Sequence, residues 1–197
     1  MRKPELKLIL RPTKVTYKIP AILSQTEVQK IINAAINIRN KTLLIIIYGA
    51  GLRVSEAVKL RKGDIDRSRM TLHIRCCKNR KDRLVILSPI VLNYLEIYWK
   101  QCKFENYIFP GNGIDHITAG TAASIYKKAK KSAGVTKTGG IHALRHAFAT
   151  HSLESGINLF AIKQLLGHSS IHSTVRYLSF VPNINQNIKS PIDNLEL

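Results

Sequence analysis

The sequence predicts an α+β fold that is mostly α-helical, a helical bundle with a small antiparallel β-sheet or hairpin. Apolar residues recur at helical spacing along much of the chain, as at Val28, Ile31, Ile32 and Ala35. The period changes around residues 70–87, where two short segments favour strands. With 197 residues and 45% hydrophobic content, the chain is long enough for one domain with its own core.

Residues 24–60 carry the signals of three helices. Ser24-Gln25-Thr26-Glu27 matches a capping box, so the first helix should begin here and run to about Arg39. A second helix, apolar on most sides, covers roughly residues 41–50 and is broken by glycines. The third begins near Val54. Each of these helices presents an apolar face that must be buried.

The strand signals follow directly. Residues 70–75 alternate in polarity like a half-buried strand, and residues 83–87 form a second short strand. The turn between them is basic, and its cations are Lys78, Arg80 and Lys81. A hairpin with a cationic tip is therefore predicted.

Helices dominate again after the hairpin. Ser88-Pro89 should begin a helix that runs to about Gln101, because proline is favoured at the first helical position. A loop is expected over residues 102–117. The remaining predicted helices cover about 118–132, 142–155, 158–166 and 171–179, and Gly167 is the expected C-cap of the helix at 158–166.

The helix at residues 118–132 should have a cationic face opposite its apolar stripe. The lysines on this face are Lys127, Lys128, Lys130 and Lys131. A charge run is usually a solvated surface, but the overall composition favours phosphate contacts here. These four lysines, together with Arg80 and Lys81 of the basic turn, are therefore candidate DNA-binding residues.

The composition points to a polyanionic partner. The net charge is +19, from 31 Lys and Arg against 12 Asp and Glu, and the pI is about 10.1. Nucleic acid is the commonest partner of so basic a domain, although a surface kept for solubility or for anionic membrane is the alternative.

Cysteine usage and hydropathy bear on the cellular compartment. The three cysteines, Cys76, Cys77 and Cys102, form neither a disulfide framework nor a zinc motif, and they read as reduced thiols. No signal peptide is recognisable. The most apolar run, residues 43–48, is far shorter than the ~20 residues of a membrane span. A cytoplasmic protein without membrane contact is expected.

The candidate reactive residues suit cleavage of a DNA phosphodiester by a tyrosine. A phenol has a pKa near ~10 and needs activation, while arginine forks can neutralise the charge of a phosphorane. A lysine can protonate the leaving oxygen, and imidazoles can bind the other oxygens or accept the phenolic proton. The chain supplies each part: Arg53, Lys78, His142, Arg145, His168 and Tyr177.

Together these residues resemble the catalytic domain of the tyrosine recombinase, or phage integrase, family over about residues 23–180. The family's first box is similar to residues 49–60, and its second box is similar to residues 142–150 with 165–170. Its lysine-bearing hairpin resembles residues 78–85, and its nucleophile segment resembles residues 174–177.

The resemblance implies a role for each matching residue. Tyr177 would be the nucleophile that forms a 3′-phosphotyrosyl bond, and Arg53 and Arg145 would clamp the scissile phosphate. Lys78 would be the general acid, with Lys81 as the rival for that role. His142 and His168 would complete the pocket, and Glu56 would be a supporting carboxylate.

Two further histidines, His146 and His151, lie near the site in sequence, and we interpret them as structural. No metal is implied, because two arginines can neutralise the charge of the phosphorane. No cofactor is implied either, since the phosphotyrosine conserves the energy of the broken bond and resealing needs no ATP. No carboxylate cluster resembles a two-metal site, which argues against metal-dependent nuclease chemistry.

The predicted organisation is a basic N-terminal arm at 1–22, the catalytic domain at 23–180 and a tail at 181–197. The resemblance would lead one to expect a separate helical DNA-clamping domain, and none is recognisable before residue 23. Double-stranded DNA is the implied partner. A homotetramer is expected on DNA and a monomer or dimer in its absence, and a second recombinase could act as partner.

Two rival functions share most of these features. A type IB topoisomerase or hairpin-forming resolvase would use the same pocket, and its products would be relaxed DNA or sealed hairpins instead of exchanged strands. A non-catalytic DNA-binding member of the fold would bind but not cleave. Tyr177→Phe separates this last alternative from an enzyme.

Overall fold

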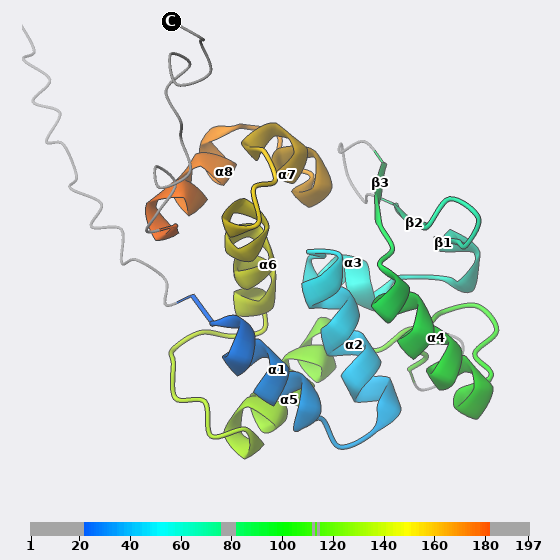
Figure 1. The fold of residues 1–197 in the computed structure, drawn as a ribbon. Coiled ribbons are helices and arrows are strands. Elements are labelled where there is room, and N and C mark those ends of the chain that lie inside the picture. The colour runs from blue at the N-terminus through cyan, green and yellow to red at the C-terminus, as the bar shows by residue number, and fades with distance from the viewer. Residues whose placement is uncertain (1–21, 76–81, 112, 114, 182–197) are drawn as a thin grey trace, which may run out of the picture.

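The computed structural model describes residues 22–75, 82–111, 113 and 115–181, and Figure 1 shows their arrangement. The α-helices of these ranges are α1 (Gln25–Asn33), α2 (Ile38–Gly49), α3 (Val54–Val58), α4 (Pro89–Cys102), α5 (Ala119–Ser132), α6 (His142–Glu154), α7 (Leu159–Leu166) and α8 (His172–Val175). Two 3-10 helices, η1 (Lys62–Asp64) and η2 (Arg176–Phe180), and the strands β1 (Ile65–Asp66), β2 (Thr71–Ile74) and β3 (Arg83–Ile86) complete the fold. The predicted class, mostly helical with a small antiparallel sheet, is confirmed.

Helix α2 lies at the centre of the main hydrophobic core. Its residues Leu43, Leu44, Ile46 and Ile47 are fully buried, and the helix packs against α1, α3, α4, α5 and α6. A helix that is apolar on most sides needs neighbours on all of them, as the sequence predicted.

Local capping sets the first helix boundaries. The Ser24 backbone N–H donates to Glu27 Oε2 (2.7 Å), and the Ser24 side chain accepts from the Glu27 backbone, so the predicted capping box is present. Helix α1 nevertheless ends at Asn33 instead of continuing to Arg39. The Asn37 side chain caps the Asn40 backbone N–H at 2.9 Å, and α2 therefore begins at Ile38, earlier than predicted.

The sheet is antiparallel with the order β1-β2-β3. Thr71 pairs with Ile86 and Ile74 pairs with Arg83. Both predicted strands are present, and β1 was not predicted because two residues are too few to show alternation. The tip of the hairpin, with Lys78, Arg80 and Lys81, lies outside the described residues.

Helix α6 joins the main core to a smaller C-terminal cluster. It packs against α1 and α2 on one side and against α7 and η2 on the other, and Figure 1 shows α7 and α8 gathered at one end of α6. The small cluster contains Ala149, Ile162, Leu166 and Tyr177. The single helix predicted at residues 171–179 is instead the short α8 followed by the 3-10 turn η2.

Across the described ranges, no helix combines the length and the apolar character needed to cross a membrane.

Candidate active site

The site begins at the N-terminus of α3, where Arg53 is the N-cap residue. Glu56 reaches back to accept hydrogen bonds from the Arg53 backbone N–H (2.8 Å) and from Arg53 Nη1 (2.9 Å). The first bond satisfies a backbone donor that a helix start leaves without an intrahelical partner. One carboxylate therefore both caps the short helix and orients an arginine of the predicted clamp.

Arg83 of β3 binds the same carboxylate. Its Nη1 and Nη2 each lie 2.9 Å from one Glu56 oxygen, and its Nε donates to the Leu165 carbonyl at 2.8 Å. Burial alone would raise the pKa of Glu56, but the hydrogen bonds and charge of Arg83, aided by Arg53, lower it to about 2. Glu56 is therefore ionised at neutral pH. Arg83 was missing from the predicted site residues.

Arg145 is the most deeply placed arginine of the site. Its side chain is only 6% exposed and lies 3.8 Å from Glu56. Nη1 donates to the Gly51 carbonyl (2.7 Å) and Nη2 to the Leu166 carbonyl (2.6 Å). Burial, together with the neighbouring charge of Arg53, lowers the pKa of Arg145 to about 10. It remains cationic at neutral pH, and its orientation is fixed.

Tyr177 lies on η2 and is 3% exposed. Its hydroxyl is 2.9 Å from Nδ1 of His146, and its ring is nearly parallel to that of His168, with centroids 6.4 Å apart. Burial raises the pKa of Tyr177, while the charges of Arg145, Arg176 and Arg53 counteract part of that rise. The phenol therefore lies within reach of the arginine charges.

His168 follows Gly167, which has a left-handed φ of 62° and caps α7 as predicted. The His168 Nδ1 lies 2.9 Å from the hydroxyl of Thr174, which is itself fully buried. Burial and the positive charges of Arg145 and Arg53 lower the pKa of His168 to about 4. His168 is therefore neutral at physiological pH and has a fixed orientation.

His142 begins α6 and is exposed. It is four residues from His146 on the same helix, hence on the same face, and its charge is among those that lower the pKa of His146. His142 is thus an exposed neighbour of His146 at the start of α6.

The structure brings together five of the predicted residues: Arg53, Glu56, Arg145, His168 and Tyr177. Lys78, Lys81 and Arg80 fall outside the described residues. His146, which we interpreted as structural, contacts the tyrosine hydroxyl directly. Its spacing from His142 was the one signal that could have placed it in the site. His151 contacts Tyr48 instead, with Nδ1 2.9 Å from the tyrosine hydroxyl.

The lysines of α5 divide into two groups. Lys127, Lys128 and Lys131 are exposed. Lys130 is partly buried, and its ammonium group donates to the carbonyl oxygens of Lys137 and Gly139. Three of the four predicted lysines are therefore available to a partner, while Lys130 also holds the loop after α5.

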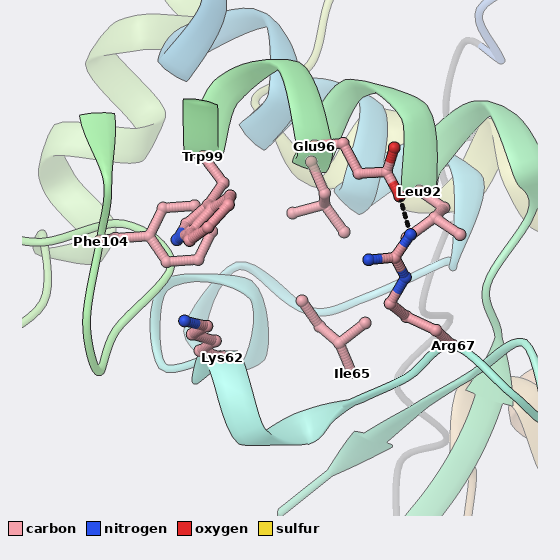
Figure 2. A pocket seen from close by; sticks show the side chains of 8 residues that line it. Lys62, Ile65, Arg67, Leu92, Glu96, Trp99 and Phe104 are labelled. Atoms are coloured by element: carbon pink, nitrogen blue, oxygen red, sulfur yellow. Dashed lines mark hydrogen bonds and ion pairs between the residues drawn. The ribbon is translucent and has the colours of Figure 1, made fainter. Parts of the chain in front are cut away.

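Within the described ranges, His, Cys, Asp and Glu side chains form no group of three or more that could hold a metal ion. A separate cavity of about 280 Å³ lies between α4 and the η1–β1 segment, as Figure 2 shows. Lys62 Nζ lies over the Trp99 ring there, 4.9 Å from its centroid, and Arg67 pairs with Glu96. Its described lining includes none of the predicted site residues.

Comparison with known proteins agrees with this geometry. The model of the phage integrase family matches residues 21–182. The chain belongs to the phage integrase family. The resemblance inferred from the sequence is thereby confirmed.

Individual relatives within this family carry recombinase names. The chain is 38% identical over 188 residues to a putative integrase/recombinase, y4qK, of Sinorhizobium fredii, covering 95% of the chain and 61% of the relative. It is 37% identical over 172 residues to the tyrosine recombinase XerA of Pyrococcus horikoshii, covering 85% and 60%. The chain thus spans about three fifths of the length of these relatives.

Solved structures show the same fold. A crystal structure of XerA recombinase superposes with a TM-score of 0.75 at 30% identity, covering 81% of this chain and 60% of that one. A post-cleavage complex of the XerH site-specific recombinase with its palindromic difH substrate also gives a TM-score of 0.75, covering 84% and 51%. At 24% identity, this second likeness concerns the fold alone.

Proposed function

We propose that this protein is a site-specific DNA recombinase that cleaves and rejoins duplex DNA through a 3′-phosphotyrosine at Tyr177. The observation that carries the proposal is a buried phenol whose hydroxyl lies 2.9 Å from His146 Nδ1 and whose ring is nearly parallel to that of His168. The charges of Arg145, Arg176 and Arg53 also favour ionisation of this phenol. The chain's membership of the phage integrase family supports the same reaction.

The charge balance of the site suits a phosphorane. Arg53, Arg83 and Arg145 all lie within 4 Å of Glu56. Three guanidinium charges against one carboxylate leave a net charge of +2 on this cluster, since 3 − 1 = 2. A pentacoordinate phosphorane carries more negative charge than the phosphodiester, so a fixed cationic cluster stabilises the transition state more than the ground state.

The reaction balances without an external oxidant or energy source. Tyr177 Oη attacks phosphorus and loses its proton, the bond from phosphorus to the 5′-oxygen breaks, and that oxygen takes a proton from Lys78. A 5′-hydroxyl of another strand then reverses these steps and releases the tyrosine. The bond energy is kept in the phosphotyrosine, so neither ATP nor a cofactor is required.

The partner in this proposal is double-stranded DNA in the cytoplasm. The exposed lysines of α5, Lys127, Lys128 and Lys131, contribute phosphate contacts. Further contacts come from Lys78, Arg80 and Lys81, which lie outside the described residues. Strand exchange requires two duplexes, and four copies of the chain on DNA, or copies of a partner recombinase, complete the assembly. The XerH complex with its substrate supports DNA as the ligand of this fold.

Covalent trapping tests the proposal. Wild-type protein and Tyr177→Phe are incubated in EDTA with nicked suicide duplexes drawn from the DNA that flanks the gene, because a nick lets the cleaved end diffuse away and stops religation. We expect a denaturation-resistant adduct on the 3′-phosphate with wild type and none with Tyr177→Phe. Equal DNA binding by both proteins, measured in parallel, ensures that loss of the adduct reports chemistry.

Each rival function predicts another product. Tight binding without an adduct from the wild type would favour the non-catalytic alternative. An adduct followed only by relaxation of supercoiled plasmid, with no exchange between two sites, would favour a topoisomerase.

A further inference from the structure

Two imidazoles, His146 and His168, lie against the Tyr177 ring, and they differ in what their nitrogens contact. His168 is parallel to the ring, and its Nδ1 is committed to the Thr174 hydroxyl at 2.9 Å. His142 is exposed at the start of α6. His146 alone among the described histidines has a nitrogen at hydrogen-bond distance from the Tyr177 hydroxyl, at 2.9 Å.

We propose that His146 is a catalytic residue of this site, the base that accepts the phenolic proton of Tyr177 during cleavage. The assignment rests on the proposed function, since it concerns the same reaction. The Tyr177 O–H bond breaks as the bond from Oη to phosphorus forms, and the proton moves to His146 Nδ1. During rejoining, His146 returns this proton to Oη as the tyrosine leaves.

The geometry defines the state in which His146 can act. The hydroxyl donates to Nδ1 only if the imidazole is neutral and carries its proton on Nε2. The charged or titratable neighbours of His146 are His142 and Arg145 on its own helix and Arg176 and Tyr177 on η2. Burial lowers the pKa of His146, and His142, Arg145 and Arg176 lower it further. The lone pair is therefore available at neutral pH.

The surrounding cations also explain how a weak base can function. The arginines disfavour an imidazolium in the free site, but the incoming phosphate brings negative charge that offsets them. Proton transfer to His146 is then coupled to phosphorus attack, because the phosphorane is most negative when the imidazole becomes positive. Arg145 cannot replace His146 as the base, since its guanidinium is cationic at neutral pH and has no lone pair to accept a proton.

The chain contains a matched control on the same helix. His151 Nδ1 also lies 2.9 Å from a tyrosine hydroxyl, that of Tyr48, and burial also lowers the pKa of His151. The two pairs have the same chemistry, but only one includes the proposed nucleophile. His146→Asn and His151→Asn therefore remove equivalent hydrogen-bonding imidazoles, and an asparagine amide can retain a hydrogen bond without acting as a base.

The experiment measures single-turnover formation of the covalent adduct on suicide duplexes. We expect His146→Asn to be slower by about 100-fold or more, the range of a general base, and His151→Asn to stay within about threefold of wild type. The rate of the wild type should fall toward acidic pH, and His146→Asn should lose this dependence. Added imidazole should partly restore the rate of adduct formation by His146→Ala. This second variant keeps the test valid if asparagine disturbs the packing.

A second substrate separates the base from the acid. If the 5′-bridging oxygen is replaced by sulfur, the leaving group no longer needs a proton. We expect this substrate to rescue Lys78→Ala and to leave His146→Asn slow. Two outcomes would overturn the assignment of His146 and leave the proposed function standing. One is rescue of His146→Asn by the sulfur substrate, and the other is adduct formation by His146→Asn at the wild-type rate. Absence of any adduct with wild-type protein would instead overturn the proposed function on which it rests.

Discussion

Glu56 is the residue to which the arginines of the site are bound. Its two oxygens accept hydrogen bonds from Arg53 and Arg83, and the Arg145 guanidinium lies 3.8 Å away. A buried carboxylate among three cations stabilises the fold because removing it leaves positive charges close together with no counterion.

We predict that Glu56→Gln lowers the free energy of unfolding by about 3 kcal/mol, the usual cost of breaking a buried ion pair. Urea denaturation at pH 7 measures it. Glu96→Gln is the control, because the Arg67–Glu96 pair is exposed and such pairs contribute less than about 1 kcal/mol. Equal losses in the two variants would contradict the prediction.

The Glu56 variant should also change the acid dependence. The pKa of Glu56 is lowered from 4.5 to about 2 in the folded protein. Its stabilising contribution is therefore complete above pH 4.5 and is lost as the pH falls toward about 2. Glu56→Gln should lack this component of acid unfolding.

Gly51 is a second residue that matters to the site, because its position leaves no room for a larger side chain. Its φ is +60°, and a Cβ added there would lie 2.3 Å from Cδ1 of Phe148. Its carbonyl also accepts from Arg145. Both the backbone conformation and the close packing therefore select glycine.

We predict that Gly51→Ala destabilises the protein by at least about 2 kcal/mol more than Gly134→Ala, because overpacking adds to backbone strain. Gly134 has a similar φ of +66° with nothing within 4 Å of an added Cβ, so it isolates the backbone contribution. Thermal unfolding of the two variants gives the difference. A Gly51→Ala protein as stable as Gly134→Ala would show that Phe148 can move aside.

At the scale of elements, β3 is fastened to α3 and α7 through one side chain. Arg83 bonds Glu56 of α3 and the Leu165 carbonyl of α7. Lys78 lies five positions before Arg83 in the sequence, so the position of the strand bears on where the proposed general acid can reach.

We predict that Arg83→Lys slows cleavage by roughly tenfold to a hundredfold, the effect of a misplaced catalytic group, with little change in DNA affinity. A lysine keeps the charge but cannot bond both Glu56 oxygens and Leu165 together. Arg75→Lys is the matched control, since Arg75 makes a single Nε contact with Asp64 at 2.7 Å. Comparable cleavage by Arg83→Lys and wild type would argue against this coupling.

Local signals in the sequence predicted the helices and strands well, and long-range contacts account for what was missed. The Ser24 cap, the Ser88-Pro89 start and the Gly167 end depend on neighbouring residues, so each was visible. The Asn37 cap was overlooked, and the 3-10 form of η2 had no sequence signal. The pairs His146–Tyr177 and Arg83–Glu56 join residues 31 and 27 positions apart, and only the folded chain brings them together.

At the scale of the whole molecule, three buried or half-buried histidines make stability depend on pH. Burial is the first cause that lowers the pKa of His146, His151 and His168, the last to about 4. The unfolded chain therefore binds more protons than the folded one below the ordinary histidine pKa of about 6.5.

We predict that the free energy of unfolding is highest above about pH 6.5 and decreases as the pH falls from there toward about 4. Urea denaturation at a series of pH values measures the slope. His151→Asn should reduce this slope, because it removes one of the contributing imidazoles, and this imidazole contacts Tyr48 instead of the site. A stability that is constant between pH 7 and pH 5 would contradict this sign.

The net charge of +19 leads to a prediction about salt. DNA affinity should fall steeply as the salt concentration rises. Replacing Lys127, Lys128 or Lys131 by glutamine should in each case reduce the slope of log K against log salt concentration by about 1. Lys130→Gln should change the slope little, because its ammonium group donates to the carbonyls of Lys137 and Gly139. Titrations at several salt concentrations compare the variants. Identical slopes in all of them would place the DNA on another face.

The arginine cluster draws its members from α3, β3 and α6, and none of these elements holds it alone. Helix α3 has only five residues, too few to persist as an isolated helix in water. A chain still emerging from the ribosome, or one whose C-terminal helices have come apart, therefore has no assembled arginine cluster. Under the proposed function, the dispersal of the cluster along the sequence would restrict DNA cleavage to the fully folded protein.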